Sequence, residues 1–178
     1  MRRLRYSVAA TLDGFIADPN GGYDWIVMDD AIDFAATFAE FDTFVMGRKT
    51  WDVSAGVDPA EMGMTDMFAG KDVIVFSRTL KSARPGITIV DTDPVETVRA
   101  LKQKPGKDIW LFGGGSMFRT LVDAGLVDTV EVGIMPVLLS EGVPLLAPGA
   151  RVTGLKLAKY ETLPKSGVVM LSYTIPHK

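Results

Sequence analysis

Three consecutive glycines, Gly113 to Gly115, separate an apolar run of strand length from a segment with helical spacing. A strand that ends in a turn without side chains and then opens a helix presents bare backbone N–H groups and the positive end of the helix dipole. Both favour a phosphate. A tight turn alone would explain two of the glycines, because glycine accepts positive φ. Three in a row give up more conformational entropy, so this segment predicts an anion site whose ligand approaches the backbone closely.

Two further junctions between an apolar run and a polar turn add cations to the same pattern. One follows the run 43–46 and the other follows the run 73–76; their residues are Gly47, Arg48, Lys49 and Thr50 in the first, and Ser77 and Arg78 in the second. Guanidinium, ammonium and hydroxyl groups all bind phosphate oxygens. Each basic pair alone is also typical of a solvated turn. Because ligands of open α/β sheets bind at the carboxyl ends of the strands, the three junctions together predict one polyanion site.

The glycine run does not fit the dinucleotide fingerprint of the Rossmann fold. That fingerprint needs a further glycine three residues after Gly115 for close packing of the helix, and this position is Phe118. The anion predicted at this turn is therefore expected in a different α/β architecture.

Hydrophobic periodicity predicts the elements that hold these junctions. Strands are expected at 4–10, 43–46, 73–76, 87–90, 109–112, 129–137, 152–160 and 168–175, and helices at 30–40, from about 48, at 93–103 and at 116–124. Asp93 is the expected N-cap of the third helix, with Pro94 and Glu96 completing a capping box. Alternating strands and helices favour a parallel α/β core up to about residue 135, with the last two strands as an antiparallel hairpin on its edge.

Composition restricts the class of protein further. The chain has 178 residues, which suffices for one domain, 1–178, and no apolar run reaches the roughly 18 residues that span a bilayer. It has no cysteine and a single histidine, His177, so neither a thiolate metal site nor histidine catalysis is expected. The net charge of -3 offers no footprint for nucleic acid. The N-terminal residues do not form a signal peptide, and a cytoplasmic location is expected.

Five motifs in this chain resemble the dihydrofolate-reductase-like superfamily, in the group related to the C-terminal reductase domain of the riboflavin biosynthesis protein RibD. They are AATLDGFIA (9–17), YDWI (23–26), VMGRKT (45–50), VIVFSRTL (73–80) and WLFGGGSMF (110–118). They follow the family's order over about residues 4 to 137. The resemblance implies a single α/β domain with a mixed, mostly parallel eight-stranded sheet flanked by helices, an NADPH-dependent reductase activity, and a homodimer.

The resemblance also implies where NADPH would bind. Arg48, Lys49, Ser77 and Arg78 would hold the adenosine 2′-phosphate end. The pyrophosphate would contact Thr50 and the segment Gly113, Gly114, Gly115, Ser116 and Met117. Gly47 and Phe112 are also expected to contact the cofactor. Ala10 and Ile16 would line the nicotinamide. The anion site inferred from the residues and the cofactor groove implied by the family coincide.

The candidates for the substrate half are carboxylates and tryptophans. In the folate reductases a carboxylate early in the first helix assists protonation, and Asp30 lies near that place, with Asp33 as its neighbour. Asp30 beside the apolar stripe of the expected helix would be desolvated, as a general acid requires, but it is equally suited to be the N-cap, and capping or exposure is favoured for Asp33. Asp13, Trp25 and Trp51 are further substrate candidates, although a turn or core role is also open to each.

The substrate itself is less defined, because the chain departs from both relatives. Folate reductases carry an arginine just before the strand at 73–76, where this chain has Lys71, and the RibD reductases carry a longer acidic motif where this chain has Asp58-Pro59-Ala60. These departures argue against folate and against a ribosyl-phosphate pyrimidine. We expect hydride transfer to a small heterocyclic (pyrimidine- or pterin-like) or conjugated substrate; the alternative is a nucleotide-binding module without turnover.

Overall fold

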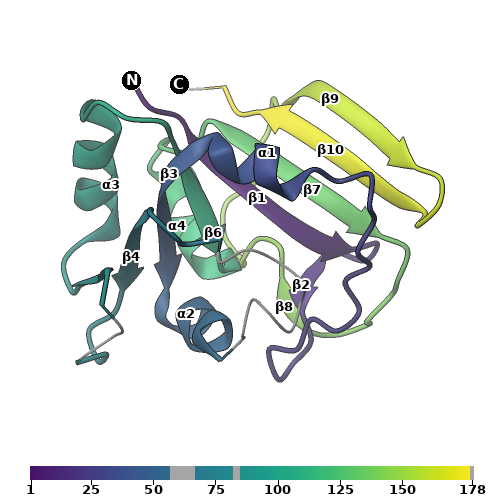
Figure 1. The fold of residues 1–178 in the computed structure, drawn as a ribbon, viewed down its shortest axis with the longest axis horizontal. Helices are drawn as coiled ribbons and strands as arrows, with labels where there is room; N and C mark the ends of the chain where they lie inside the picture. Colours follow the sequence, from purple (N-terminus) through teal and green to yellow (C-terminus); the bar gives the residue numbers. More distant parts are fainter. Residues whose placement is uncertain (57–66, 82–84, 177–178) are drawn as a thin grey trace.

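The structure is a computed structural model that describes residues 1–56, 67–81 and 85–176. Its centre is an eight-stranded sheet in the order β5-β4-β3-β6-β1-β7-β10-β9, drawn in Figure 1. Neighbouring strands from β5 to β7 are parallel, whereas β10 is antiparallel to both β7 and β9. The strands are β1 (Leu4–Thr11), β3 (Phe41–Gly47), β4 (Asp72–Phe76), β5 (Ile87–Val90), β6 (Asp108–Gly113), β7 (Thr129–Met135), β9 (Lys156–Leu163) and β10 (Val168–Thr174). The predicted mixed, mostly parallel sheet with an edge hairpin is confirmed.

Three strands differ from the sequence analysis. The strands β2 (Phe15–Ala17) and β8 (Val143–Pro144) form a separate antiparallel sheet that was not predicted, because segments this short have no periodicity to detect. The penultimate strand was predicted at 152–160 but begins at Lys156. Val152 packs against the main core from a loop, and Gly154 has a φ of 81°, a conformation that does not continue a strand.

The helices are α1 (Phe34–Ala39), α2 (Arg48–Ala55), α3 (Pro94–Gln103) and α4 (Gly115–Asp123). Asp93 caps α3 as predicted, because its side chain accepts a hydrogen bond from the Val95 amide at 2.9 Å. Glu96 pairs with Arg99 on the exposed surface of the same helix. No helix within the described ranges is long and apolar enough to cross a membrane.

The start of α1 corrects the predicted helix at 30–40. The helix begins only at Phe34, and its N-cap is Asp33, whose carboxylate accepts from the Ala36 amide at 2.8 Å. Asp30 is therefore not the N-cap. The segment before the helix forms a turn in which Asp29 accepts from the Ala31 amide at 2.9 Å. Short acidic side chains that bond nearby amides compete with helix formation, which explains the late start.

Helices cover both faces of the sheet. On one face, α3 and α4 bury Val98, Phe118 and Leu121 against the β1 and β6 residues Tyr6 and Leu111. The opposite face carries two separate clusters. An aromatic cluster holds α1 and α2 side chains against β3, β4 and β6, and includes Phe38, Phe44, Trp51, Trp110 and Phe112. A loop cluster packs Trp25, Ile26 and Ile32 against Ala9, Met135, Leu163, Val168 and Met170.

Candidate functional site

The three predicted junctions meet at one edge of the sheet. Gly47 at the end of β3 is paired with Phe76 at the end of β4, and Met46 beside it is paired with Gly113 at the end of β6. The residues that follow these positions open α2, the turn after β4, and α4. Figure 1 shows α2 beginning at this edge, close to the small β2–β8 sheet. Parallel pairing therefore gathers segments that are far apart in the sequence.

The N-termini of α2 and α4 share an unusual feature. Their N-caps are Gly47 and Gly114, and among the described residues no side chain accepts a hydrogen bond from the first amides of either helix. Gly47 has φ -83° and ψ 165°, and Gly114 has φ -93° and ψ -168°, which are extended conformations open to any residue. These φ and ψ angles alone do not require glycine at either position. Within the described part of the chain, the first-turn amides of both helices are therefore left without a capping side chain.

Close contacts link these two helix starts. A Cβ atom added to Gly113 or Gly114 would lie 3.4 Å from Thr50 Oγ1, and one added to Gly114 would also lie 4.0 Å from Ile16 Cδ1. A Cβ atom on Gly47 would lie 3.9 Å from Met117 Cε. The structure therefore brings together six of the predicted cofactor positions around a single cradle, formed by the starts of α2 and α4.

The three glycines of the run have different constraints. Gly113 has a φ of 139°, which side chains rarely adopt. A Cβ atom on Gly115 would lie 2.3 Å from the Pro144 carbonyl oxygen, so this glycine lets β8 pack against α4. Gly114 has a negative φ, and a Cβ atom added there would lie no closer than 3.4 Å to another atom. The value of φ explains Gly113 and the packing of β8 explains Gly115, but neither explains Gly114.

Cations flank the cradle. Lys49 and Arg78 are exposed and have no hydrogen-bond or ion-pair partner among the residues that the structure describes. Arg48 pairs with Asp52 at 2.6 and 2.7 Å on the surface of α2, an exposed contact of the kind that a ligand displaces at little cost. The Ser77 hydroxyl oxygen accepts from the amides of the next turn at 2.9 and 3.2 Å, which leaves its proton to donate.

The remaining predicted cofactor residues lie at the same edge but in different surroundings. Ala10 is fully buried in the core on the α3 and α4 face, so its side chain does not line an open surface. Phe112 packs edge-on against Phe44 and Phe68 in the aromatic cluster. Ser116 is exposed in the first turn of α4, where its amide is one of those without a cap.

The predicted proton donor, Asp30, lies on the surface. Its side chain is 94% exposed and accepts from Lys165 of the β9–β10 turn at 2.9 Å. The desolvated position beside an apolar stripe that the sequence suggested is therefore not the one that Asp30 occupies. Asp33 is exposed as well and caps α1, which is the role favoured from the sequence.

The buried carboxylate of this segment is Asp29, which sequence reasoning missed. Only 7% of the residue is exposed. The nearby Ser166 hydroxyl, the Ala31 amide and the Lys165 ammonium lower the pKa of Asp29 below its usual value, although Oδ2 has no hydrogen-bond partner among the described residues. Asp29 is thus held ionised between the loop and the β9–β10 turn. Nothing in the sequence separates it from Asp30, because the partner that buries it is more than a hundred residues away.

Asp13 has a structural role in the described arrangement. Its carboxylate accepts from the Thr11 hydroxyl at 2.6 Å and from the Ser140 amide at 2.7 Å, with longer bonds from the Leu139 amide. The Thr11 hydrogen bond, followed by these amides, lowers the pKa of Asp13. The residue ties the β1–β2 turn to the loop after β7, and so fixes the end of β1 at the site edge.

The two tryptophans occupy different places. Trp51 is 4% exposed inside the aromatic cluster, as expected of a core residue. Trp25 is half-buried in the loop cluster, and its indole N–H has no hydrogen-bond partner within the described part of the chain. The two clusters stand on opposite sides of β1. The Asp58-Pro59-Ala60 segment and His177 lie outside the described residues.

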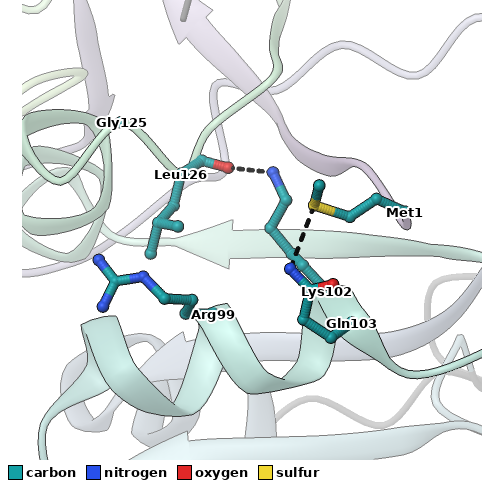
Figure 2. Close-up of a pocket in the computed structure, with 6 residues that line it drawn as sticks. All are labelled: Met1, Arg99, Lys102, Gln103, Gly125 and Leu126. Atoms are coloured by element: carbon teal, nitrogen blue, oxygen red, sulfur yellow. Dashed lines mark hydrogen bonds between the residues drawn. The ribbon is translucent and has the colours of Figure 1, made fainter. Parts of the chain in front are cut away.

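A separate hollow of about 290 Å³ lies away from these residues, between the N-terminus, α3 and the turn after α4 (Figure 2). It is lined by Met1, Arg99, Lys102, Gln103, Gly125 and Leu126. The Lys102 ammonium is already bonded to the Leu126 carbonyl at 2.6 Å and to Asp128 at 2.5 Å. The Lys102 ammonium therefore stabilises the fold. The hollow is separate from the cradle at the starts of α2 and α4.

Comparison with known proteins accounts for this arrangement. Residues 2–169 match the model of the RibD C-terminal domain family. The chain belongs to the RibD C-terminal domain family. It is 37% identical over 178 residues to the uncharacterized protein YyaP of Bacillus subtilis (strain 168), covering 97% of this chain and 94% of YyaP.

Solved structures with similar folds support this family assignment. A crystal structure of a riboflavin biosynthesis protein, described as putative, from Shewanella sp. PV-4 superposes with a TM-score of 0.80 and 26% identity, covering 99% of both chains. Dihydrofolate reductase from Enterococcus faecalis, solved in complex with NADP(H), gives a TM-score of 0.71 at 17% identity over 97% of this chain and 96% of that one. The expected dihydrofolate-reductase-like fold of the RibD C-terminal type is confirmed. The family and these folds support a reductase of the RibD and dihydrofolate reductase type.

Proposed function

We propose that this protein is an NADPH-dependent reductase that transfers a hydride to a small heterocyclic or conjugated substrate. The observation that carries this proposal is the pair of helix N-termini at Gly47 and Gly114, which lack capping side chains although their backbone would allow them. A pyrophosphate would satisfy the free amides and the positive ends of both helix dipoles.

Different residues of the chain would bind different parts of the cofactor. The Thr50 hydroxyl faces the Gly113–Gly114 turn and would donate to a pyrophosphate oxygen there. Arg48, Lys49, Ser77 and Arg78 would bind the 2′-phosphate through charge-assisted hydrogen bonds. Ile16 of β2, beside Gly114, would contact the nicotinamide. The bound cofactor supplies the hydride, while the protein orients the two reactants and shields them from water.

Turnover tests this function directly. Purified protein should bind NADPH with quenching of protein fluorescence, and should oxidise it when dihydropterins, aminopyrimidines or quinonoid compounds are supplied. Absence of NADPH binding would defeat the proposal. Tight binding without oxidation of NADPH by any of these compounds would instead favour a nucleotide-binding module without turnover.

We also propose that the protein is a homodimer that uses the outer part of the β9–β10 hairpin. β9 is the edge strand of the sheet, and its residues Lys156 to Thr162 are all exposed. Leu157 is 52% exposed and Tyr160 is 68% exposed, with Leu155 beside them, while Val169 and Leu171 of β10 are half-buried. Exposed apolar edge strands favour pairing with another chain. Light scattering at micromolar concentration should give twice 19.3 kDa; a species of 19.3 kDa would exclude the dimer.

A further inference from the structure

A strap of residues 139–147 lies between the two segments that would contact the nicotinamide and the pyrophosphate. On one side the strap contains β8, which pairs with β2 at Phe15 and Ala17. Figure 1 shows these two short strands side by side near α2. A Cβ atom added to Gly142 would lie 2.2 Å from the Ala17 carbonyl oxygen, so strap and strand are in close contact. Ile16, the proposed nicotinamide contact, lies between the two paired residues of β2 and is positioned by the strap.

The other side of the strap contacts the start of α4. A Cβ atom added to Gly115 would lie 2.3 Å from the Pro144 carbonyl oxygen, and the Ala147 amide donates to the Gly115 carbonyl at 3.3 Å. The Leu145 carbonyl accepts from the Tyr6 hydroxyl at 3.2 Å, and Tyr6 is fully buried in the main core. These contacts hold the strap against the helix start that is the proposed pyrophosphate site.

Asp13 holds the strap where it begins. Its carboxylate accepts from the Leu139 amide at 3.1 Å, from the Ser140 amide at 2.7 Å and from the Thr11 hydroxyl at 2.6 Å. Thr11 is fully buried at the end of β1, and its hydroxyl oxygen accepts from the Phe15 amide at 2.9 Å. One carboxylate therefore connects the strap to both ends of the β1–β2 turn.

The backbone of Ser140 shows that the beginning of the strap is held in an unusual conformation. Its φ is 69°, in the left-handed region that residues other than glycine rarely adopt. Such conformations persist where surrounding contacts hold them in place, and they are found most often at functional sites. The bond from the Ser140 amide to Asp13 is one such contact. Asp13 thus stabilises a conformation of the strap that the backbone alone does not favour.

We propose that Asp13 is a positioning residue for the cofactor, which acts through the strap to hold Ile16 and the start of α4 in one arrangement. The proposal rests on the proposed NADPH site, because these two segments would contact the nicotinamide and the pyrophosphate. Without the carboxylate, the strap keeps its pairing with β2 and the bond from the Leu145 amide to the Gly14 carbonyl at 2.9 Å. We therefore expect the fold to persist while the binding arrangement is only fractionally populated, which weakens NADPH binding in proportion.

Two ligands separate this role from a general loss of stability. NADPH would contact both segments, whereas adenosine 2′-monophosphate would contact only the cations and the serine at the ends of β3 and β4, outside the strap. Each ligand is titrated by calorimetry into the parent protein and into Asp13→Ala. We expect NADPH to bind the variant about tenfold more weakly, and adenosine 2′-monophosphate to bind both proteins equally.

Asp18→Ala is the matched control. Asp18 directly follows β2 and also accepts from two amides, those of Asn20 at 2.7 Å and Gly22 at 2.8 Å, but both belong to its own turn. Its loss should leave the affinity for both ligands unchanged. Asp13→Asn is the second variant, to be used also if Asp13→Ala does not fold. It keeps one acceptor oxygen, so NADPH affinity should fall by about threefold.

Three outcomes would overturn the proposal: unchanged NADPH affinity in the folded Asp13 variants, an equal weakening of both ligands, or the same loss of NADPH affinity in Asp18→Ala. Thermal unfolding checks that each variant is folded. A parent protein that does not bind NADPH defeats the proposed function and this inference with it. When the parent binds NADPH, the variants decide the role of Asp13 alone.

Discussion

The helix N-termini of this protein fall into two groups. α1 and α3 are capped by Asp33 and Asp93, whose carboxylates accept from the first-turn amides. α2 and α4 have glycine as N-cap, and no such acceptor lies among the described residues. An aspartate satisfies a helix start and stabilises it, whereas a glycine in an extended conformation leaves the same amides available to an external anion. The difference indicates which helix ends serve the fold and which serve a ligand.

The largest expected effect comes from giving α2 the kind of cap that α1 and α3 have. Gly47→Asp is sterically allowed, since the backbone is extended and the nearest atom to an added Cβ is 3.9 Å away. The new carboxylate would occupy the first-turn amides and repel a phosphate, so NADPH affinity should fall about 100-fold or more. Fluorescence titration measures it. Gly47→Ala is the control and should lose far less; equal losses would mean that bulk alone is responsible.

A smaller effect is expected from removing the flanking cations. Arg48→Ala combined with Arg78→Ala should weaken NADPH by about one to two decades, corresponding to roughly 1.5 to 3 kcal/mol for charge-assisted bonds. NADH lacks the 2′-phosphate and should bind the variant and the parent almost equally. Parallel dissociation constants for the two cofactors check this. The same preference for NADPH in both proteins would reject these residues as the 2′-phosphate site.

A loss of stability without a loss of NADPH affinity is expected at α3, whose N-terminus is capped by a side chain. Asp93→Ala removes the N-cap of α3 and should lower the free energy of unfolding by about 1 kcal/mol. α3 starts after β5, whose last residue Val90 is paired with Phe76 at the end of β4. NADPH affinity of the folded protein should nevertheless stay unchanged, because Asp93 is not among the residues proposed to hold the cofactor. Urea denaturation and a cofactor titration on the same sample measure both quantities. A loss of affinity without loss of stability would contradict the division into two groups.

The smallest effect is expected from a substitution of Asp30, because the N-cap of α1 is Asp33 and not Asp30. Asp30→Asn loses only an exposed pair with Lys165, so stability should change by less than about 1 kcal/mol. Turnover should stay within about threefold of the parent, because the exposed Asp30 carboxyl is paired with Lys165 and is not desolvated as a general acid requires. A fall of about 100-fold in hydride transfer with unchanged NADPH affinity would instead identify Asp30 as the proton donor.

Local patterns sufficed to predict that the eight strands of the main sheet exist, together with the glycine junctions and the Asp93 cap, because each depends on residues adjacent in sequence. The convergence of the junctions also followed from general rules of parallel sheets. The start of α1 could not be predicted in this way. Asp29, Asp30 and Asp33 are all suitable caps, and their roles are set by contacts with Ser166 and Lys165 of a distant hairpin. Likewise, the packing requirement at Gly115 comes from β8, which is too short to predict.

The few contacts that hold α1 on the sheet determine how readily this helix opens. The helix has six residues, none of them fully buried, and ammonium groups from Lys71 and Lys107 hold the carbonyls at its C-terminal end. By contrast, α4 buries Phe118, Leu121 and Val122 in the main core. Such a helix can open locally without unfolding the sheet. Its amide hydrogens should exchange with deuterated solvent well before those of α4, and a ligand that packs against Phe38 should slow that exchange.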